Sequence, residues 1–315
     1  MLSRSYYFIT IMQQKILTLL TKLAHELSPV YEHPSEQQQT AWWLLQALTE
    51  KSEAQLLAQQ EIKLTEEQEQ QLNRWIDEHV NQRKPLQYIL GSTPFDGLLI
   101  LCEPPTLIPR PETEELTINL AEKLTTLAKP LTVLDLATGT GCIALALAKR
   151  LPQANIYATD ISEKALDLAK RNAKFNTINN VTFMHSDVFN NIPKNIMFDI
   201  IISNPPYISA EEYKKLAPSV AEWEDKKALV AEHDGFAIIE EIIKEAPNFI
   251  RFNENLFLAG IPQVIIEIGY RQGNRAKELM QKALYTNVKV EQDLEGKDRV
   301  IVGRVPRATG TGPTS

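Results

Sequence analysis

The sequence predicts an α/β fold with a mostly parallel sheet, preceded by a small helical bundle. Three observations support this prediction. Residues 12–84 show helical periodicity and contain no glycine. From Pro130 onward, short apolar runs alternate with helical patterns, and a glycine-rich turn follows the first of those runs. Alternation of this kind produces parallel strands with helices on both faces of the sheet.

The N-terminal helices are indicated by apolar spacing and by capping signals. Apolar residues between Ile16 and Leu27 recur at steps of three and four, as on one face of an amphipathic helix. A second helix begins near Pro34. The stretches Ser52–Gln55 and Thr65–Gln68 each place Gln three residues after a hydroxyl side chain. This capping-box pattern predicts the starts of a third and a fourth helix.

The pattern of apolar residues changes at Pro85. Two short apolar runs, Pro85–Gly91 and Phe95–Cys102, predict a β-hairpin, and four prolines between residues 104 and 111 predict irregular backbone. We therefore divide the chain into a helical domain (1–84), a hairpin and proline-rich linker (85–111), an α/β domain (112–307) and a disordered tail (308–315).

The α/β domain has regularly alternating signals. Strands are expected at Thr132–Leu136, Asn155–Thr159, Val181–His185, Phe198–Ser203, Gln263–Glu267, Val288–Gln292 and Val300–Arg304. Helices are expected at Glu112–Leu127, Cys142–Leu151, Ser162–Phe175, Asp234–Ile250 and Gly273–Ala283.

Composition limits the possible functions. The net charge, 33 basic minus 40 acidic residues or -7, disfavours a broad basic face for nucleic acid, although it leaves room for a local basic groove. Cys102 and Cys142 have no CxxC spacing, which predicts neither a metal site nor a disulfide framework and fits the reducing cytoplasm. No apolar run reaches the roughly 18 residues of a membrane-spanning helix.

The first residues are ambiguous. Up to Met12 they contain one Arg and no acidic residue, so a weak targeting segment is one interpretation. A long apolar stretch and a small-residue cleavage site are missing. We favour a ragged start or an upstream initiator, with Met12 beginning the folded part.

A glycine-rich turn follows the first predicted strand. Asp135 precedes it, and its residues are Ala137, Thr138, Gly139, Thr140 and Gly141. Glycines let the backbone approach a ligand, and the following helix presents free N–H groups. Asp160 ends the next strand and could accept both ribose hydroxyls of a nucleoside. The same pattern, with Ala144, also fits a dinucleotide fingerprint or a turn that merely packs a helix.

Asp135 favours S-adenosylmethionine (SAM) over NAD. A carboxylate directly before the turn would repel a pyrophosphate, whereas it suits a ligand with an ammonium group. SAM carries an amino group, a sulfonium and no phosphate. Asp187, after the third strand, could accept the adenine amino group, or it could be a helix N-cap or a loop acid.

A second motif follows the fourth predicted strand, at the edge where open α/β sheets bind ligands. It consists of Asn204, Pro205, Pro206 and Tyr207. The prolines stiffen the backbone and remove two N–H donors. The Asn204 side-chain oxygen and the Pro205 carbonyl could accept the N–H groups of a planar amino group while Tyr207 stacks on its face. A plain turn is the alternative, which the upstream glycine turn disfavours.

Together the two motifs resemble the amino-group class of SAM-dependent methyltransferases, which includes DNA adenine, ribosomal RNA and protein glutamine methyltransferases. Further segments resemble the HemK/PrmC family of release factor glutamine N(5)-methyltransferases. These segments are Pro85–Gly91 with Phe95, Leu107–Glu114, Glu267–Gly269 with Gln272, and Gly296–Val300. The resemblance covers about residues 85–304, and residues 12–84 share with the family only their helical character.

The resemblance implies a Rossmann-like SAM-dependent methyltransferase domain with a mostly parallel seven-stranded sheet. It implies methyl transfer to the glutamine of the Gly-Gly-Gln loop of a peptide chain release factor, docked by residues 1–84. The chain would be a cytoplasmic monomer without a metal, and without direct contact to nucleic acid or membrane. By position, the SAM contacts would be Asp135, Ala137, Thr138, Gly139, Thr140, Gly141, Asp160, Asp187, Val188 and Asn204, and the catalytic residues Asn204, Pro205, Pro206 and Tyr207.

The sequence departs from the family pattern at three positions. Ala137 replaces the usual first glycine of the turn, which is tolerable if its φ is negative. Val188 stands where many members have an aromatic residue against the adenine, and Asp225 replaces a usual proline. Arg110 and Glu112 are family positions whose role is open between a structural salt bridge and a substrate contact.

Three rival functions remain. A DNA or RNA amino-group methyltransferase would share the tetrapeptide, but the basic residues between 149 and 174 are interleaved with acidic ones, as on a solvated helix face. An NAD oxidoreductase would leave Asn204–Tyr207 without a role. A SAM-binding adaptor without turnover is disfavoured by the intact tetrapeptide.

Overall fold

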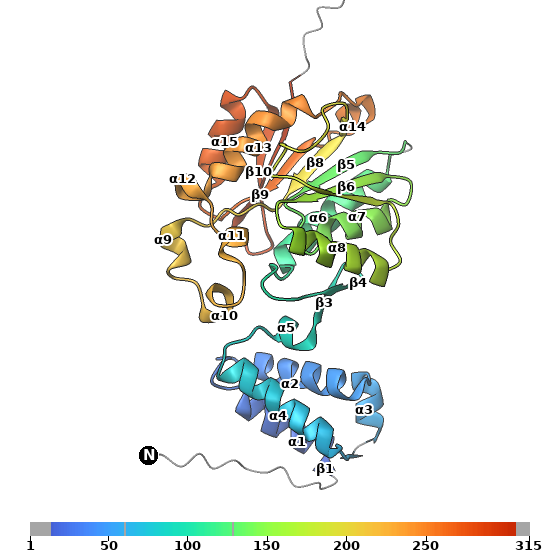
Figure 1. Cartoon of the computed structure of the whole chain (residues 1–315), viewed down its shortest axis with the longest axis vertical. Helices are drawn as coiled ribbons and strands as arrows, with labels where there is room; N and C mark the ends of the chain where they lie inside the picture. Colours follow the sequence, from blue (N-terminus) through green and yellow to red (C-terminus); the bar gives the residue numbers. More distant parts are fainter. Residues whose placement is uncertain (1–13, 60, 128, 307–315) are drawn as a thin grey trace, which may run out of the picture. The chain divides into compact units, whose positions relative to one another are not determined.

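The computed structural model describes residues 14–59, 61–127 and 129–306. These residues form two compact units that divide between Leu90 and Gly91 (Figure 1). Our expectations for the start of the chain, including Met12, and for the tail 308–315 lie outside the described residues.

The first unit is built of helices. They are α1 (Ile16–Glu26), α2 (Pro34–Thr49), α3 (Glu53–Gln59), α4 (Glu66–Val80) and α5 (Leu86–Leu90), with a short antiparallel pair, β1 (Gln14–Lys15) and β2 (Glu61–Ile62). Fully buried leucines from α1, α2 and α4, among them Leu23 and Leu44, form its core. The capping box predicted at Thr65 is present, because Thr65 Oγ1 accepts from the Gln68 N–H while the Gln68 side chain accepts from the Thr65 N–H.

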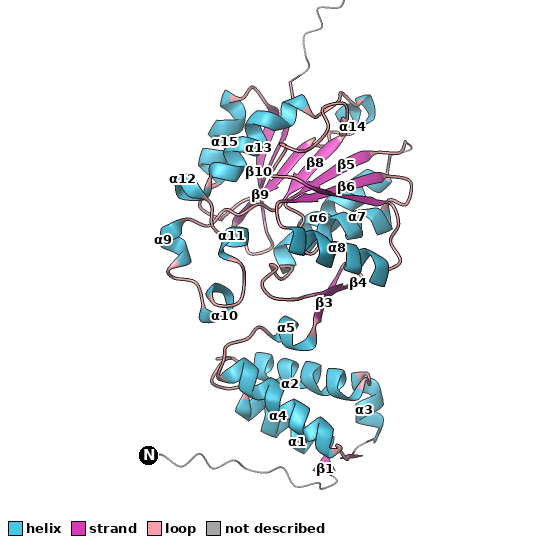
Figure 2. Ribbon diagram, viewed as in Figure 1, coloured by secondary structure: helices cyan, strands magenta, loops and turns pink. Residues whose placement is uncertain are grey.

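The second unit contains a seven-stranded sheet with the order β10-β11-β9-β8-β5-β6-β7. Figure 2 shows this sheet and the helices around it. The strands are β5 (Thr132–Leu136), β6 (Asn155–Asp160), β7 (Val181–His185), β8 (Ile200–Ser203), β9 (Val264–Glu267), β10 (Thr286–Gln292) and β11 (Asp298–Arg304). Strands β5 to β9 pair in parallel, and β11 pairs antiparallel with both β9 and β10. The predicted mostly parallel sheet is confirmed.

Helices cover both faces of this sheet. Helices α6 (Pro111–Thr125), α7 (Cys142–Arg150) and α8 (Glu163–Phe175) share one buried cluster with it, and α13 (Ala237–Glu245) and α15 (Gly273–Lys282) share the other. Val133 and Leu134, neighbours in β5, belong to different clusters, because successive side chains of a strand point to opposite faces. Burial on both faces explains why the central strands are nearly continuous apolar runs.

The strand order reverses at β5. This strand pairs with β6 on one side and with β8 on the other. A reversal of this kind opens a crevice at the carboxyl ends of the two central strands. The glycine turn follows β5 and the Asn204 tetrapeptide follows β8, so both predicted motifs start at this edge of the sheet.

The hairpin exists, but the bounds of both predicted strands were wrong. The predicted strand Phe95–Cys102 contains the hairpin turn, and only its part from Leu98 to Leu101 is a strand. Pro85–Gly91 does not form a strand, since helix α5 occupies it and Pro85 O accepts from the N–H groups of Tyr88 and Ile89. The hairpin consists of β3 (Ser92–Phe95) and β4 (Leu98–Leu101). Asp96 and Gly97 join them with φ of 47° and 69°, the left-handed conformation that a two-residue hairpin turn needs. A short apolar run cannot be assigned to strand or helix from periodicity alone.

The helix expected over residues 234–250 is interrupted. It consists of α12 (Glu232–Gly235), α13 and a 3-10 turn (Ala246–Asn248). His233 and Asp234 have positive φ, 55° and 58°, which breaks the helical path before α13. Four further short helices were not predicted. They are α9 (Ala210–Tyr213), α10 (Pro218–Ala221), α11 (Lys226–Leu229) and α14 (Glu254–Leu258).

Candidate active site

The glycine turn joins β5 to α7. Thr138 N donates to the Thr159 carbonyl of β6 at 2.9 Å, and Gly141 N donates to Thr138 O at 2.8 Å. Gly141 has φ of 83°, and a side chain there would place its Cβ 3.0 Å from the Ala169 Cβ of α8. Gly141 is therefore needed both for the backbone conformation and for the close approach of α8.

Ala137 does not have the negative φ under which we expected the alanine to be tolerated. Its φ is 57°, in the left-handed region that disfavours any residue with a Cβ. The turn that follows β5 imposes this conformation, because Thr138 is held by β6 immediately afterwards. The alanine is accommodated with strain at a position where a glycine would carry none.

Asp135 lies fully buried under the turn. Its Oδ2 accepts from Thr138 Oγ1 at 2.5 Å and from Ala144 N at 3.1 Å, so the carboxylate connects β5 to both the turn and α7. Its Oδ1 has no hydrogen-bond partner among the described residues. Burial raises the pKa of Asp135 to about 7, although these two hydrogen bonds act in the opposite direction.

Asp160 closes the turn from the neighbouring strand. Its Oδ2 accepts from Gly139 N and its Oδ1 from Ser162 N, each at 2.8 Å. Burial raises the pKa of this carboxyl group. Each carboxylate oxygen has two lone pairs, so both keep capacity to accept one more hydrogen bond. Asp160 is therefore fixed beside the glycine turn, and its contact with ribose hydroxyls stays a prediction.

Asp187 and Val188 lie in the turn after β7. Asp187 is exposed, and its carbonyl and Oδ2 accept from the main chain and side chain of Asn190 at 2.8 and 3.3 Å. No hydrogen bond among the described residues joins it to the glycine turn. Val188 has φ of 44°, which is unusual for a β-branched residue. The Ser186 hydroxyl donates to Val188 O and fixes this conformation.

The tetrapeptide begins where β8 ends and is fixed at both ends. The Ser203 hydroxyl donates to Leu136 O of β5 at 2.8 Å. Asn204 Nδ2 donates to Thr113 Oγ1 in the first turn of α6 at 3.0 Å. Gln272 Nε2 donates to Tyr207 O at 2.9 Å, and the Tyr207 hydroxyl donates to Glu267 Oε1 at 3.2 Å.

The chain leaves the tetrapeptide and returns to it. Ile208 forms an isolated parallel bridge with Val230, in which Ile208 N donates to Leu229 O and Ala231 N donates to Ile208 O. The returning chain then passes Tyr207 so closely that a Cβ on Gly235 would lie 2.1 Å from Tyr207 O. The main chain of Tyr207 therefore packs directly against the main chain of Gly235, where no side chain would fit.

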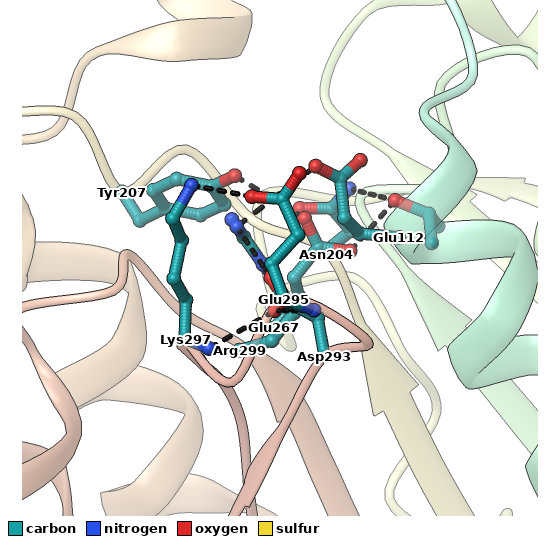
Figure 3. Close-up of polar contacts among 9 residues, drawn as sticks. Glu112, Asn204, Tyr207, Glu267, Asp293, Glu295, Lys297 and Arg299 are labelled. Atoms are coloured by element: carbon teal, nitrogen blue, oxygen red, sulfur yellow. Dashed lines mark hydrogen bonds and ion pairs between the residues drawn. The ribbon is translucent and has the colours of Figure 1, made fainter.

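Glu267 and Thr113 are site residues that our sequence analysis did not assign. Glu267, labelled in Figure 3, is 1% exposed at the carboxyl end of β9. Its Oε2 accepts from Thr113 Oγ1 at 2.7 Å. With the bond from Tyr207, its two oxygens hold both ends of the tetrapeptide. Burial raises the pKa of Glu267 to about 7. The available signal was its position, because an acid directly after a buried parallel strand lies at the ligand edge of the sheet.

Arg110 and Glu112 have different surroundings. Arg110 donates twice to Glu224, at 2.8 and 2.6 Å, and Glu224 is buried, which raises the pKa of that carboxyl group. This is the structural salt bridge that was one of the two interpretations. Glu112 is half exposed, 3.9 Å from Arg299. Asp225 N donates to Pro105 O, and the Asp225 side chain caps α11, which accommodates this departure from the family pattern.

Within the described residues, no group of three or more His, Cys, Asp and Glu side chains is arranged to hold a metal ion. None of the described helices is both long enough and apolar enough to cross a membrane.

Comparisons with known proteins identify the relatives of this chain. The family model "PrmC N-terminal domain" matches residues 18–91, and "Methyltransferase small domain" matches residues 113–222. A release factor glutamine methyltransferase of Streptococcus pneumoniae is 40% identical over 246 residues, 78% of this chain and 82% of the relative. One of Lactococcus lactis subsp. lactis is 37% identical over 278 residues, 88% of this chain and 92% of the relative.

A solved structure shares the fold. The hMettl16 catalytic domain in complex with MAT2A 3'UTR hairpin 6 matches 80% of this chain and 87% of its own, with a TM-score of 0.51 and 14% identity. At that identity the likeness shows the fold alone. The identity to the bacterial relatives extends over most of both chains, and it shows that this chain belongs to the family of release factor glutamine methyltransferases, which are SAM-dependent enzymes.

Proposed function

We propose that this chain transfers a methyl group from SAM to the side-chain amide nitrogen of the glutamine in the Gly-Gly-Gln motif of a peptide chain release factor. The observation that carries the proposal is the contact between Ser203 and Leu136. It brings the start of the tetrapeptide next to the end of the strand that leads into the glycine turn. A methyl donor held at that turn and an amide held at Asn204 would be neighbours.

The residues of the turn fit SAM. Asp135 Oδ1 is a buried acceptor without a partner among the described residues, and a Cβ on Gly139 would meet no atom within 4 Å. An oriented buried acceptor and open space beside a glycine suit a ligand that brings a donor group. We assign SAM binding to Asp135, Ala137, Thr138, Gly139, Thr140, Gly141, Asp160, Asp187, Val188 and Asn204.

SAM supplies a methyl group activated by its sulfonium. The chain's own residues then have to make an amide nitrogen reactive, although its lone pair is delocalised into the carbonyl. The Asn204 side-chain oxygen and the Pro205 carbonyl accept the two amide N–H groups, and Tyr207 stacks on the amide plane. These acceptors bind more strongly as positive charge develops on the nitrogen, which stabilises the transition state more than the ground state.

Alignment supplies the rest of the acceleration. Pro205 and Pro206 stiffen the corner, and well-oriented reactants can gain up to roughly 7–11 kcal/mol. A strong base is not needed, because the proton on nitrogen becomes very acidic once the methyl group is transferred. We further propose that the enzyme acts as a cytoplasmic monomer, that residues 1–84 dock the release factor, and that nucleic acid is not bound directly.

Mass spectrometry of a release factor incubated with this chain and SAM tests the proposal. We expect the tryptic peptide that contains Gly-Gly-Gln to gain the mass of one methyl group, and a release factor with that glutamine replaced by alanine to gain none. Bulk RNA and DNA offered with labelled SAM serve as the rival substrates. Labelling of nucleic acid in place of the release factor would refute the proposal.

A further inference from the structure

We propose that Glu267 is a positioning residue for this reaction, one that sets which arm of the Asn204 carboxamide faces the target glutamine and holds Tyr207 beside it. The inference rests on the proposed function, because it concerns how the same corner is oriented. It assigns a role to two residues, Glu267 and Thr113, that lie outside the tetrapeptide and the glycine turn.

The first step is geometric. Glu267 ends β9, the strand next to β8, and is buried against the tetrapeptide. Its Oε2 accepts from Thr113 Oγ1 at 2.7 Å and its Oε1 accepts from the Tyr207 hydroxyl at 3.2 Å (Figure 3). One carboxylate thus reaches the last residue of the tetrapeptide directly and the first residue through Thr113.

The second step follows from counting hydrogens. A threonine hydroxyl has one hydrogen to donate, and an ionised carboxylate can only accept. Thr113 therefore gives its hydrogen to Glu267, and its oxygen is left as an acceptor. Asn204 can approach that oxygen only with its NH2 group, which is the arrangement observed at 3.0 Å. Glu267 thereby determines the orientation of a carboxamide that it does not touch.

The third step connects this orientation to the reaction. With the NH2 arm bound to Thr113, the oxygen arm of Asn204 is the one that remains, and no described residue donates a hydrogen bond to it. That oxygen is the acceptor that the target amide needs. The opposite orientation would set the Asn204 NH2 group against the N–H groups of the substrate, donor against donor, and would withdraw the acceptor on which the rate depends.

The ionisation of Glu267 controls this relay, which is the chain of hydrogen bonds from Glu267 through Thr113 to Asn204. Burial raises its pKa to about 7, while the Thr113 hydrogen bond, Arg299 of β11 and the Tyr207 hydroxyl lower it and Glu112 of α6 raises it. Arg299 is itself paired with Asp293 at 3.0 Å. A protonated Glu267 could donate to Thr113, whose hydroxyl could then donate to the oxygen arm of Asn204. The reaction should therefore slow as the pH falls through about 7.

Thr113→Val tests the relay with little change in shape. We expect kcat for release factor methylation to fall by about 10²-fold, the usual effect of removing one oriented polar group from a reacting centre. Calorimetric SAM affinity should stay unchanged, and Thr113→Ser, which keeps the hydroxyl, should recover most of kcat. Thr117→Val is the matched control, because Thr117 is also fully buried on α6 but its hydroxyl donates only to Thr113 O. It should keep the wild-type kcat.

The pH profile gives a readout that a merely structural role would not move. Wild-type kcat should rise through about pH 7, and Glu267→Gln should be slow and lack that rise. Asp135, whose pKa is raised to a similar value, is present in both proteins, so a rise that persists in Glu267→Gln belongs to Asp135 and overturns the proposal. Equal kcat in Thr113→Val and Thr117→Val would also overturn the proposed role of Glu267. The proposed function is tested separately, because it stands if Asn204→Ala is inactive.

Discussion

The hydroxyl of Ser203 donates a hydrogen bond of 2.8 Å to the carbonyl oxygen of Leu136, which ties the last residue of β8 to the last residue of β5. The two strands pair in parallel, with Leu136 opposite Ser203. The spacing between the glycine turn and the tetrapeptide is therefore set by the sheet. Sites built on such rigid elements hold their geometry better than sites built on loops.

Asn204→Ala should lower methyl transfer by at least about 10²-fold, because it removes the acceptor that we propose faces the developing charge. SAM affinity should remain measurable, since Asp135 and Asp160 lie on β5 and β6. Labelled-methyl transfer and calorimetry measure the two effects. Asn155→Ala, at an exposed asparagine that begins β6 at the opposite edge of the sheet, is the control and should behave as wild type. Near-normal turnover of Asn204→Ala would refute the assignment.

Ala137→Gly should stabilise the second unit. The φ of 57° at this position strains any residue with a Cβ, and glycine removes that cost of about 1 kcal/mol. Urea denaturation followed by circular dichroism measures the change. Ala148→Gly, in the regular part of α7, should instead lower the free energy of unfolding by about 1 kcal/mol. A destabilised Ala137→Gly would show that the left-handed turn carries no strain.

Arg110→Ala should destabilise the chain by about 2 kcal/mol, because it leaves the buried Glu224 carboxylate without its partner. The loss is smaller than for a fully buried pair, because the Arg110 side chain is one-third exposed and solvent screens its charge. The double variant with Glu224→Gln should regain most of this loss. Lys214→Ala, from an exposed pair, should change stability by less than about 0.5 kcal/mol. If the double variant is stable yet has a raised KM for the release factor, Arg110 contacts the substrate as well.

Glu267→Gln should gain stability relative to the parent as the pH rises from 5 to 8. The unfolded carboxyl group has a pKa near 4.5 and the folded one about 7. The folded state therefore keeps a proton that the unfolded state has lost, and this stabilising contribution disappears as the pH rises through 7. The difference in unfolding free energy between the two proteins should change by about 2.5 kcal/mol from pH 5 to pH 8. Denaturation of both proteins across this range measures it, and a difference independent of pH would contradict the raised pKa.

Much of the site could be predicted because it depends on local sequence. Parallel strands end at the same edge of a sheet, so the turn after β5 and the tetrapeptide after β8 had to meet. The position of Asp160 beside the turn follows for the same reason, because it is the acid that ends the next strand. The order of strands and helices followed from alternation of apolar runs.

The remainder depends on contacts distant in sequence. Thr113 lies 91 residues before Asn204, and only the packing of α6 against the carboxyl edge of the sheet brings them together. The left-handed φ of Ala137 reflects the constraint from β6, which residue type alone does not reveal. Helix α5 has an apolar run too short for its period to show. The Asp96-Gly97 pair is a hairpin-turn signal that our sequence analysis did not use and that would have located the hairpin.

The bridge between Ile208 and Val230 allows the segment between them to vary in length. The bridge holds the two ends of this segment together next to the Asn204–Tyr207 corner. The segment, which carries α9, α10 and α11, is therefore a loop closed at its base, and its length does not set the position of that corner. Lengthening such a loop adds little closure entropy, about 0.6 kcal/mol for each doubling. Residues 210–221 can therefore vary in length without moving that corner, whereas Glu224 and Asp225 are held by Arg110 and Pro105.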